Sequence, residues 1–515
     1  MPPYTGTGFH GLADHTAGSV TVRLATAAAL VAALLALVAL PFLHRDEVVV
    51  ATASTPPNVV VIMTDDQDPA SVKVMKTVQR TLVARGVSFA NSYATTPECC
   101  PSRVSFETGQ YAHNHGVLTR HPPDGGYQAF AAQPALIENA LPAALHGAGY
   151  RTAYIGKYMN GYGISDYGGV QSPGIRRYVP PGWDRWYVPI DHTEYRMYGY
   201  RLNENGHPRS YGLARSDYQT DVYARLAQAF VSQSANRRQP FFLTVGTLAP
   251  HLEDPSLVGP REHGRNPRPA PRDLGRFARR PLPRPPSFNE PNVSDKPSFV
   301  RNTPKLGRTK ISQLRNTYRS RLESLLTVDD LVRGLVHRLR AAGELDNTYI
   351  VFTSDNGYML GEHRKQGKHV VYEESVRVPL IVRGPGLPAG QVRGQLAANI
   401  DLAPTILDAA GVPPRLKMDG ISLLPPARDP ASGGTRSLVL EYLVGRTGYS
   451  AVRTPDGFLY AEHRNGEHEL YDLNTDPYEL HNLAGKPAEA DLEADLAKRL
   501  ATLRDCAGSA CNSAG

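Results

Sequence analysis

Residues 58–66 read NVVVIMTDD, and residues 348–356 read TYIVFTSDN. Each stretch is a short run of β-branched and aromatic residues that ends in polar residues. A run of this length and composition is typical of a buried β-strand. Between about residues 57 and 382, similar runs alternate with helical stretches. The alternation predicts an α/β fold with a large, mainly parallel sheet that is flanked by helices.

Polar residues follow four of the predicted strands at the point where each strand ends. The strands and the residues after them are Asn58–Met63 with Asp65 and Asp66, Tyr150–Ile155 with Lys157, Phe241–Val245 with His251, and Tyr349–Thr353 with Asp355 and Asn356. Ligands bind outside the carboxyl ends of the strands in open α/β sheets, so we expect these side chains to converge on one site. A single polar strand end is explained equally well as an ordinary solvated loop.

Two of these strand ends carry the ligands that a hard cation prefers. Asp65, Asp66 and Asp355 offer carboxylates, and Asn356 offers an amide oxygen. Such an all-oxygen set suits Ca²⁺ or Mg²⁺, and no nearby cluster of His and Cys in the sequence indicates zinc. Paired aspartates also cap helices and form turns. Because both pairs follow a predicted buried strand, a metal site is the stronger interpretation.

Composition and charge limit the range of functions. The 515 residues are sufficient for one large domain and a smaller one, and 41% of them are hydrophobic, which permits a sizeable core. The formal net charge of +7 favours anionic partners. No nucleic-acid partner is expected, because no nucleic-acid-binding motif accompanies the charge. The excess lies mainly in the Pro- and Arg-rich insert 252–310, which is typical of a solvated, partly disordered arm but could instead hold a polyanion.

The N-terminal region indicates export. Residues 24–43 are almost wholly apolar and long enough to span a bilayer. Residues 1–23 before them are then either a cytoplasmic segment or the n-region of a signal sequence, and a small-residue site at 51–53 would allow cleavage. A membrane anchor and a cleaved signal sequence both place the rest of the chain outside the cytoplasm, as an anchored or a secreted protein.

The exported part divides into three predicted regions, which are a catalytic domain at 55–430, a small α+β domain at 431–505 and a tail at 506–515. Short strands near 438–442 and 449–453, followed by a helix near 488–503, predict the small domain. Cys506 and Cys511 are spaced for a small loop, so we expect them to form a disulfide in an oxidising compartment.

One further motif names a family. Residues 99–103 read CCPSR, a Cys-x-Pro-x-Arg pattern, which alone also fits a buried or disulfide-linked pair of cysteines. Together with other segments it resembles type I sulfatases over roughly residues 55–505, in particular the branch of N-acetylglucosamine-6-sulfatases and heparan sulfatases. The other segments are HNH at 113–115, GYRTAYIGKYMNGYG, FFLTVGTLAPH, TYIVFTSDNGYMLGEH, GKHVVYEESVRVPLIVRGPG and ELYDLNTDPYELHNLA.

The resemblance implies an alkaline-phosphatase-like fold and an enzyme that uses a modified cysteine. A formylglycine-generating enzyme would convert Cys99 to an aldehyde, whose hydrate contacts the metal and attacks sulfur. The metal, usually Ca²⁺, falls on Asp65, Asp66, Asp355 and Asn356. The other active-site positions fall on Arg103, which would hold the hydrate and the carboxylates, on Lys157 and Lys368, which would neutralise the sulfate oxygens, and on His251, which would protonate the leaving alcohol or contact sulfate.

The chain also departs from the family pattern. Met159 stands where many sulfatases have a His, so that helper role would fall to Asn160, His113 or His115 as substrate contacts. Glu107 stands where an aliphatic residue is usual. The Cys-x-Pro-x-Arg pattern itself is intact, so we expect Cys99 to be modified.

These features predict an exported, metal-dependent hydrolase of sulfate monoesters, with sulfated amino sugars or glycans as its substrates. Two alternatives remain open. A phosphoester or phosphonate hydrolase would use the same aldehyde and metal, because phosphoryl and sulfuryl groups share their geometry. A catalytically silent, Ca²⁺-stabilised glycan-binding protein would keep Cys99 as a thiol and bind through the basic insert.

Overall fold

The computed structural model describes residues 56–164, 166–167, 170–171, 175–253, 266–432 and 435–512. The predicted segments 1–23 and 24–43 lie outside these residues. Among the described helices, none is both long and apolar enough to cross a membrane. Pro56–Gly515 forms one compact unit.

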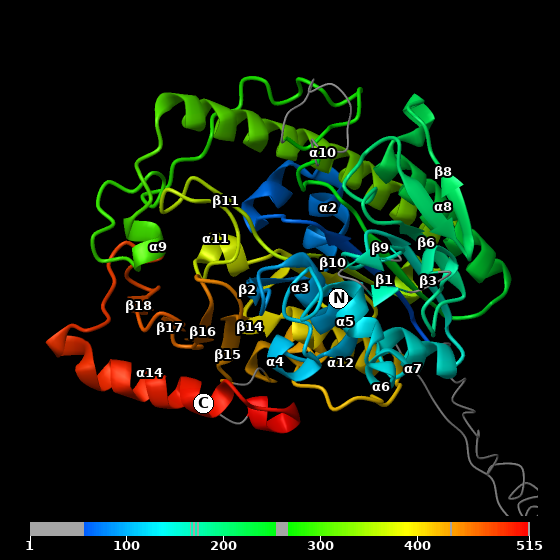
Figure 1. Cartoon of the computed structure of the whole chain (residues 1–515). Helices are drawn as coiled ribbons and strands as arrows, with labels where there is room; N and C mark the ends of the chain where they lie inside the picture. Colours follow the sequence, from blue (N-terminus) through cyan, green and yellow to red (C-terminus); the bar gives the residue numbers. More distant parts are fainter. Residues whose placement is uncertain are drawn as a thin grey trace, which may run out of the picture. The chain divides into compact units, whose positions relative to one another are not determined.

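A ten-stranded sheet forms the centre of this unit (Figure 1). Its strand order is β14-β2-β13-β10-β1-β9-β3-β6-β7-β8. The bounds are β1 Asn58–Thr64, β2 Val87–Tyr93, β3 Arg151–Gly156, β6 Arg185–Pro189, β7 Arg201–Glu204, β8 His207–Ser210, β9 Phe241–Gly246, β10 Thr348–Ser354, β13 Leu380–Arg383 and β14 Gln391–Ala398. The central strands β10, β1, β9, β3 and β6 are parallel to one another. The predicted mainly parallel sheet is therefore confirmed, with β13, β7 and β8 antiparallel to their neighbours.

Helices cover both faces of the sheet. The helices are α2 Lys76–Thr81, α3 Cys99–Thr108, α4 Ala112–His115, α5 Gly126–Ala131, α6 Pro134–Ile137, α7 Leu141–Gly147, α8 Gln219–Asn236, α9 Ser298–Arg301, α10 Arg308–Ala341, α11 Glu373–Val376, α12 Leu402–Ala410, α13 Leu424–Arg428 and α14 Ala490–Leu503. Residues of α3, α5, α6, α7 and α12 pack on one face, and residues of α2, α8 and α10 pack on the other.

The composition of β1 follows from this arrangement. Val59, Val61 and Met63 point into the core on the α3 side, whereas Val60 and Ile62 point into the core on the α10 side. A strand that is buried on both faces needs apolar side chains at every position. The unbroken apolar run therefore marks β1 as a central strand. The polar residues follow only after the strand has ended.

A four-stranded antiparallel sheet follows near the C-terminus. Its strands are β15 Leu438–Tyr442, β16 Tyr449–Arg453, β17 Phe458–His463 and β18 His468–Asp472, and α14 packs beside it. The remaining strands form two short pairs, β4 Asp166–Tyr167 with β5 Val170–Gln171, and β11 Met359–Leu360 with β12 Gln366–Gly367. Cys506 and Cys511 are joined by a disulfide.

The predicted disorder of the insert is wrong for residues 266–310, which pack on the molecule, although the five arginines between 272 and 284 are exposed to solvent as expected. The Arg272 guanidinium donates two hydrogen bonds of 2.7 Å to the Asp221 carboxylate on α8. Arg268 lies over the Tyr198 ring at 4.7 Å. Arg268 and Arg272 thus have partners in distant parts of the chain, which the composition of the insert does not reveal. Residues 254–265 of the insert lie outside the described residues.

Candidate active site

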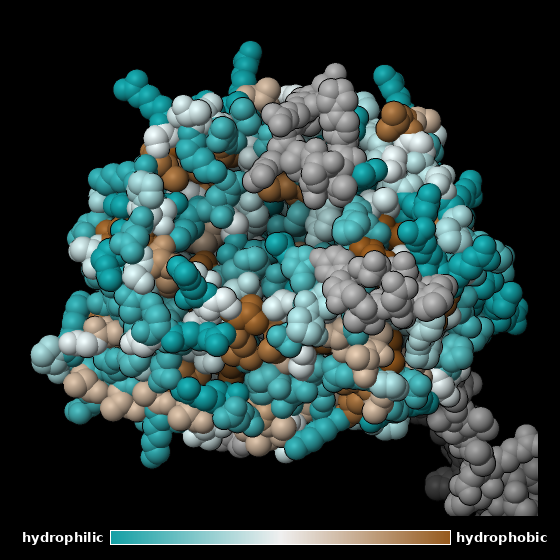
Figure 2. All heavy atoms as spheres, viewed as in Figure 1, coloured by the Kyte–Doolittle hydropathy of each residue, from teal (hydrophilic) through white to brown (hydrophobic). Residues whose placement is uncertain are grey.

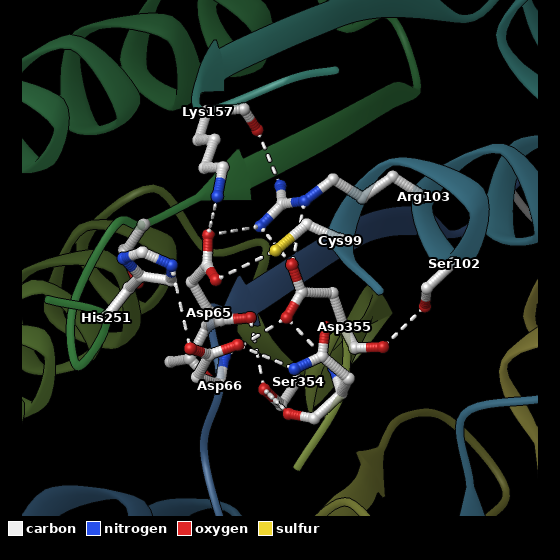
Figure 3. A network of polar contacts seen from close by, with 12 residues as sticks. Asp65, Asp66, Cys99, Ser102, Arg103, Lys157, His251, Ser354 and Asp355 are labelled. Atoms are coloured by element: carbon white, nitrogen blue, oxygen red, sulfur yellow. Dashed lines mark hydrogen bonds and ion pairs between the residues drawn. The ribbon is translucent and has the colours of Figure 1, made fainter. Parts of the chain in front are cut away.

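Four neighbouring strands, in the order β10, β1, β9 and β3, deliver polar residues to one end of the sheet. Helix α3 and the loop after β12 add three more. Figure 3 shows most of these side chains pointing toward one another. We call the set the polar cluster, and its members are Asp65, Asp66, Cys99, Arg103, Lys157, His251, Asp355, Asn356 and Lys368.

Asp65 lies between two cations. Lys157 Nζ donates to its carboxylate, and Arg103 Nη2 lies 3.3 Å from the same oxygen, Oδ2. Burial by itself would raise the pKa of Asp65, but the neighbouring Lys157 charge and the other cations outweigh it and hold this pKa below its usual range. Asp65 therefore remains an anionic ligand at the end of β1.

Arg103 connects α3 to the two central strand ends. Its Nε donates to Asp355 Oδ2 at 2.9 Å, and its Nη1 donates to the Lys157 carbonyl at 2.6 Å. The residue is 1% exposed. Because it lies one helical turn after Cys99, both side chains face the same way from α3. Arg103 thus sets the position of Cys99 relative to the carboxylates.

Asp66 faces the same site as Asp65 because the chain turns at this residue. Successive residues of a strand point to opposite faces, but Asp66 has a left-handed backbone with φ 66°. Lys368 Nζ lies 2.5 Å from Asp66 Oδ1 and 3.0 Å from Asn356 Oδ1. Asn356 Nδ2 also donates to Asp66 at 2.6 Å. The ends of β1 and β10 therefore share one lysine.

Cys99 lies at the centre of these charges. Its Sγ is 3.3 Å from Asp65 Oδ1 and 2.8 Å from Lys368 Nζ. Burial, and then the charges of Asp355 and Asp65, raise the pKa of the Cys99 thiol above its usual range. A thiol that stays protonated is a weak nucleophile. An unmodified Cys99 thiol is therefore poorly suited to act as the nucleophile of this site.

His251 lies beside Asp66, with its ring turned toward the Asp66 carboxylate (Figure 3). Its Nε2 is 3.6 Å from Asp66 Oδ2, and its Nδ1 is 2.7 Å from the Leu252 carbonyl. A carbonyl only accepts hydrogen bonds, so Nδ1 carries a proton. Burial holds the pKa of His251 below its usual value despite the neighbouring carboxylates. Nε2 is consequently the nitrogen that can exchange a proton at the site.

The charges and ligand atoms of the polar cluster are compatible with a bound divalent cation. Three carboxylates, on Asp65, Asp66 and Asp355, face three fixed cations, on Arg103, Lys157 and Lys368. Ligand atoms of Asp65, Asp66, Cys99 and His251 all lie within 4.8 Å of one another. Two of the predicted ligands, Asp355 and Asn356, lie outside this group and contact it through hydrogen bonds with Asp66. The carboxylate and amide oxygens of Asp65, Asp66, Asp355 and Asn356 are ligand types that fit Ca²⁺ or Mg²⁺. A divalent ion would make the otherwise balanced site positive and receptive to an anionic ester.

The three predicted substrate contacts have different surroundings. His113 pairs through Nδ1 with the Glu441 carboxylate at 2.8 Å and donates through Nε2 to the Cys506 carbonyl at 3.0 Å. His115 is fully buried against Ser105. The structure does not bring these two histidines to the polar cluster, because His113 faces the C-terminal sheet and His115 packs against α3. Asn160 reaches it indirectly, since its Nδ2 donates to Tyr195 Oη at 2.6 Å.

Two residues of the site were not predicted. Arg321 on α10 donates to the carbonyls of Asp66 and Pro250. These hydrogen bonds hold the loops after β1 and β9 in place. Its sequence signal is a charged residue on the buried stripe of an amphipathic helix. The Tyr195 ring lies 4.5 Å from Lys157 Nζ and 5.0 Å from the His251 ring. Tyr195 follows no motif, so only the fold reveals it.

The fold and the polar cluster are those of a hydrolase of anionic esters, and the family models define the class further. The model described as Sulfatase matches residues 57–412, and the model described as N-sulphoglucosamine sulphohydrolase, C-terminal, matches residues 361–506. The chain belongs to the sulfatase family, and it is an enzyme that hydrolyses sulfate esters.

Individual relatives agree with this assignment. The chain is 35% identical to the N-acetylglucosamine-6-sulfatase of Homo sapiens, over 90% of this chain and 88% of the relative. A solved structure described as a complex with its substrate D-glucosamine-2-N,6-O-disulfate is 26% identical, with a TM-score of 0.70 over 87% of this chain and 97% of that one. The phosphonate monoester hydrolase of Agrobacterium radiobacter has the same fold at 21% identity, with a TM-score of 0.66 over 87% of this chain and 95% of that one.

Proposed function

We propose that this sulfatase hydrolyses sulfate monoesters of amino sugars or glycans, with a formylglycine made from Cys99 and a divalent cation, Ca²⁺ or Mg²⁺. The observation that carries the proposal is the place of Cys99, which lies buried between Asp65 and Lys368 at the start of α3. The substrate class is supported by the similarity to the human N-acetylglucosamine-6-sulfatase and to the glucosamine disulfate complex.

The aldehyde at position 99 would supply a hydrated nucleophile in place of a thiol that burial keeps protonated. The cation would be held by Asp65, Asp66, Asp355 and Asn356, and it would polarise the sulfate group and lower the pKa of the attacking hydroxyl. Both groups would act in a site whose side chains are already fixed by ion pairs.

The cations of the chain have separate tasks in this proposal. Lys157 and Lys368 neutralise the negative oxygens of the sulfate, which otherwise repel a nucleophile. Each lysine is held charged, because Asp65 raises the pKa of Lys157 and Asp66 raises that of Lys368 against the effect of burial. Arg103 orients the carboxylates and the residue at position 99.

His251 would manage the proton of the leaving alcohol. Its Nε2 faces the site, and its Nδ1 is held by the Leu252 carbonyl. A protonated Nε2 would donate to the bridging oxygen as the bond to sulfur breaks, or would contact the sulfate before that step. The negative charge of a bound ester favours the protonated form of His251.

We further propose that the enzyme is exported, secreted or anchored through residues 24–43, and that a formylglycine-generating enzyme modifies Cys99 during maturation. The apolar stretch 24–43 and the Cys506–Cys511 disulfide support an oxidising compartment. The basic net charge of +7 is consistent with anionic substrates.

Peptide mass spectrometry across Cys99, on protein from its native host, tests the nucleophile. We expect an aldehyde at Cys99, and loss of turnover in Cys99→Ala. Cys100→Ala is the matched control, because Cys100 points into the hydrophobic core beside α3 rather than into the site, and it should retain activity. A fully unmodified thiol in an active enzyme would refute the assignment.

The rates on 4-nitrophenyl sulfate and 4-nitrophenyl phosphate test the reaction class, because the two esters share one leaving group. A higher kcat/KM for the sulfate supports the proposed sulfate chemistry. A higher value for the phosphate would assign the site to phosphoester hydrolysis. Binding of a sulfated polysaccharide with no turnover of either ester would favour a glycan-binding role instead.

A further inference from the structure

A pocket of about 600 Å³ lies next to the polar cluster. This volume falls within the range of small-molecule binding sites, roughly 300–1,000 Å³. Most of its lining side chains are polar and uncharged, and Figure 2 shows that hydrophilic residues cover much of the described surface on this side of the molecule. None of the residues of the polar cluster is among its lining residues, so the proposed reaction gives this pocket no role.

Three contacts connect the pocket to the reacting centre. Leu252 lines the pocket, and its carbonyl holds Nδ1 of His251 at 2.7 Å. Gln366 also lines the pocket, and it lies two residues before Lys368 in the sequence. Tyr358 lines it and lies 4.7 Å from the Arg321 guanidinium, which also donates to the Asp66 carbonyl. The pocket therefore lies on the side of the polar cluster that carries His251 and Lys368.

Two lining residues on α10 offer free hydrogen-bonding groups. Gln313 and Asn316 are exposed residues three positions apart on α10, so their side chains lie on one face of the helix. Within the described part of the chain, neither side-chain amide has a hydrogen-bond partner. An amide group both donates and accepts. Two such groups can pair with the hydroxyl and acetamido groups of a sugar ring.

One cation completes the lining. Lys310 lines the pocket, and its Nζ donates to Gln366 Oε1 at 2.5 Å, while Gln366 Nε2 donates to Tyr358 Oη at 3.2 Å. This chain of hydrogen bonds keeps the ammonium group beside the pocket. An ammonium group has three donors, so Lys310 can also bind an anionic substituent.

We propose that this pocket binds the sugar ring attached to the sulfated one, and that it selects a ring with a negative group, a carboxylate or a sulfate. The inference rests on the proposed function, since it places the leaving alcohol next to His251. Gln313 and Asn316 bind the ring hydroxyl or amide groups, and Lys310 binds the anion. The sulfatase would then favour an anionic oligosaccharide over a sulfated monosaccharide.

The double variant Gln313→Ala/Asn316→Ala tests the ring contacts. We compare kcat and KM on a sulfated disaccharide and on the matching sulfated monosaccharide. The ratio of the two kcat/KM values should fall about tenfold, mainly through KM, which corresponds to about 1.4 kcal/mol for two lost hydrogen bonds. His337→Ala, on an exposed part of the same helix, should keep the wild-type ratio. An unchanged ratio in the double variant would overturn the proposal.

Lys310→Gln tests the charge. We use three disaccharides whose second ring carries a carboxylate, a sulfate or neither group. The wild-type enzyme should prefer one or both charged rings, which identifies the anion, and Lys310→Gln should remove that preference. Equal rates on all three with the wild-type enzyme would refute the anion site.

A binding measurement separates this inference from the proposed function. If the wild-type enzyme hydrolyses no sulfate ester, calorimetric titration with the charged disaccharide still reports on the pocket. Tenfold weaker binding by the double variant would support the pocket while the proposed reaction fails. Hydrolysis with an unchanged disaccharide preference would support the reaction while the pocket assignment fails.

Discussion

We expect the side chain of His251 to affect the hydrolysis of two kinds of sulfate ester to different extents. Its Nε2 faces the site while the Leu252 carbonyl fixes the other nitrogen. Proton donation to a leaving oxygen helps most when that oxygen is strongly basic. With His251 in the proposed role, an alkyl or sugar alcohol would need its proton, whereas 4-nitrophenolate leaves readily without one.

For His251→Asn, we expect a loss of about 100-fold in kcat on a sugar sulfate and a much smaller loss on 4-nitrophenyl sulfate. Steady-state kinetics with the two substrates measures the difference. Equal losses on both would show that His251 binds the sulfate and does not protonate the alcohol.

Glu107 is an acidic residue that is buried near the end of α3. It is 2% exposed, and one carboxyl oxygen accepts from Tyr158 Oη at 3.1 Å. Burial raises the pKa of Glu107 to about 8. The folded protein therefore holds this carboxyl protonated near neutral pH, which explains how an acid can occupy a position where an aliphatic residue is usual.

The pH dependence of stability follows from this shift. The carboxyl keeps its proton longer in the folded than in the unfolded chain, so its stabilising contribution is complete below the ordinary pKa of 4.5 and is lost as the pH rises toward about 8. Relative to Glu107→Gln, the wild type should lose up to about 1.4 kcal/mol per pH unit in this window.

Urea unfolding at pH 5 and pH 8 measures this difference. Glu138→Gln, at an exposed position, is the matched control and should follow the wild type. A constant difference between the wild type and Glu107→Gln at the two pH values would contradict a buried, protonated Glu107.

At the scale of elements, α10 does more than cover the sheet. Its residue Arg321 is 2% exposed and donates to the carbonyls of Asp66 and Pro250. These carbonyls belong to the loops after β1 and β9, which carry Asp66 and His251. The helix thus holds two of the strand ends that build the polar cluster.

Replacement of Arg321 by Met should leave both carbonyls buried without a partner. An unsatisfied buried group costs about 1–3 kcal/mol, so we expect about 3 kcal/mol of destabilisation and weaker Ca²⁺ binding in calorimetric titration. Arg333→Met removes a largely exposed pair with Asp330 on the same helix, which should cost less than about 1 kcal/mol. Unchanged Ca²⁺ affinity in Arg321→Met would contradict the positioning role.

At the scale of the whole described molecule, the C-terminal sheet is built into the main body. One hydrophobic core contains Tyr93 and Ile400 from the main sheet region together with Leu440 and Tyr471 from the C-terminal sheet. Polar contacts reinforce it, including Tyr372 Oη to Glu469 at 2.8 Å. The predicted boundary near residue 430 therefore crosses a shared core.

A shared core should unfold cooperatively. Scanning calorimetry of the full chain should show one transition, and a chain that ends at Thr435 should fail to fold because Tyr93 and its neighbours would lose their cover. Two resolved transitions, or a soluble and folded shortened chain, would show that the C-terminal part is an independent domain.

Much of the fold was predictable from local patterns. Strands β15 and β16 have the predicted bounds, and β1, β3, β9 and β10 lie within one residue or so of the predicted runs. Their signal is strong because a strand buried on both faces is continuously apolar. Strands β13 and β14 were not singled out, because their place beside β2 depends on pairing across the chain.

The sequence by itself determined the sulfatase family, the buried strands and the candidate residues of the polar cluster, since apolar runs and short motifs are local properties. Only the tertiary structure decided which charges meet. Lys368 is 302 residues from its partner Asp66, Arg321 is 255 residues from the same aspartate, and His113 turns toward the C-terminal sheet. Such pairings are contacts between distant parts of the chain, and no local pattern encodes them.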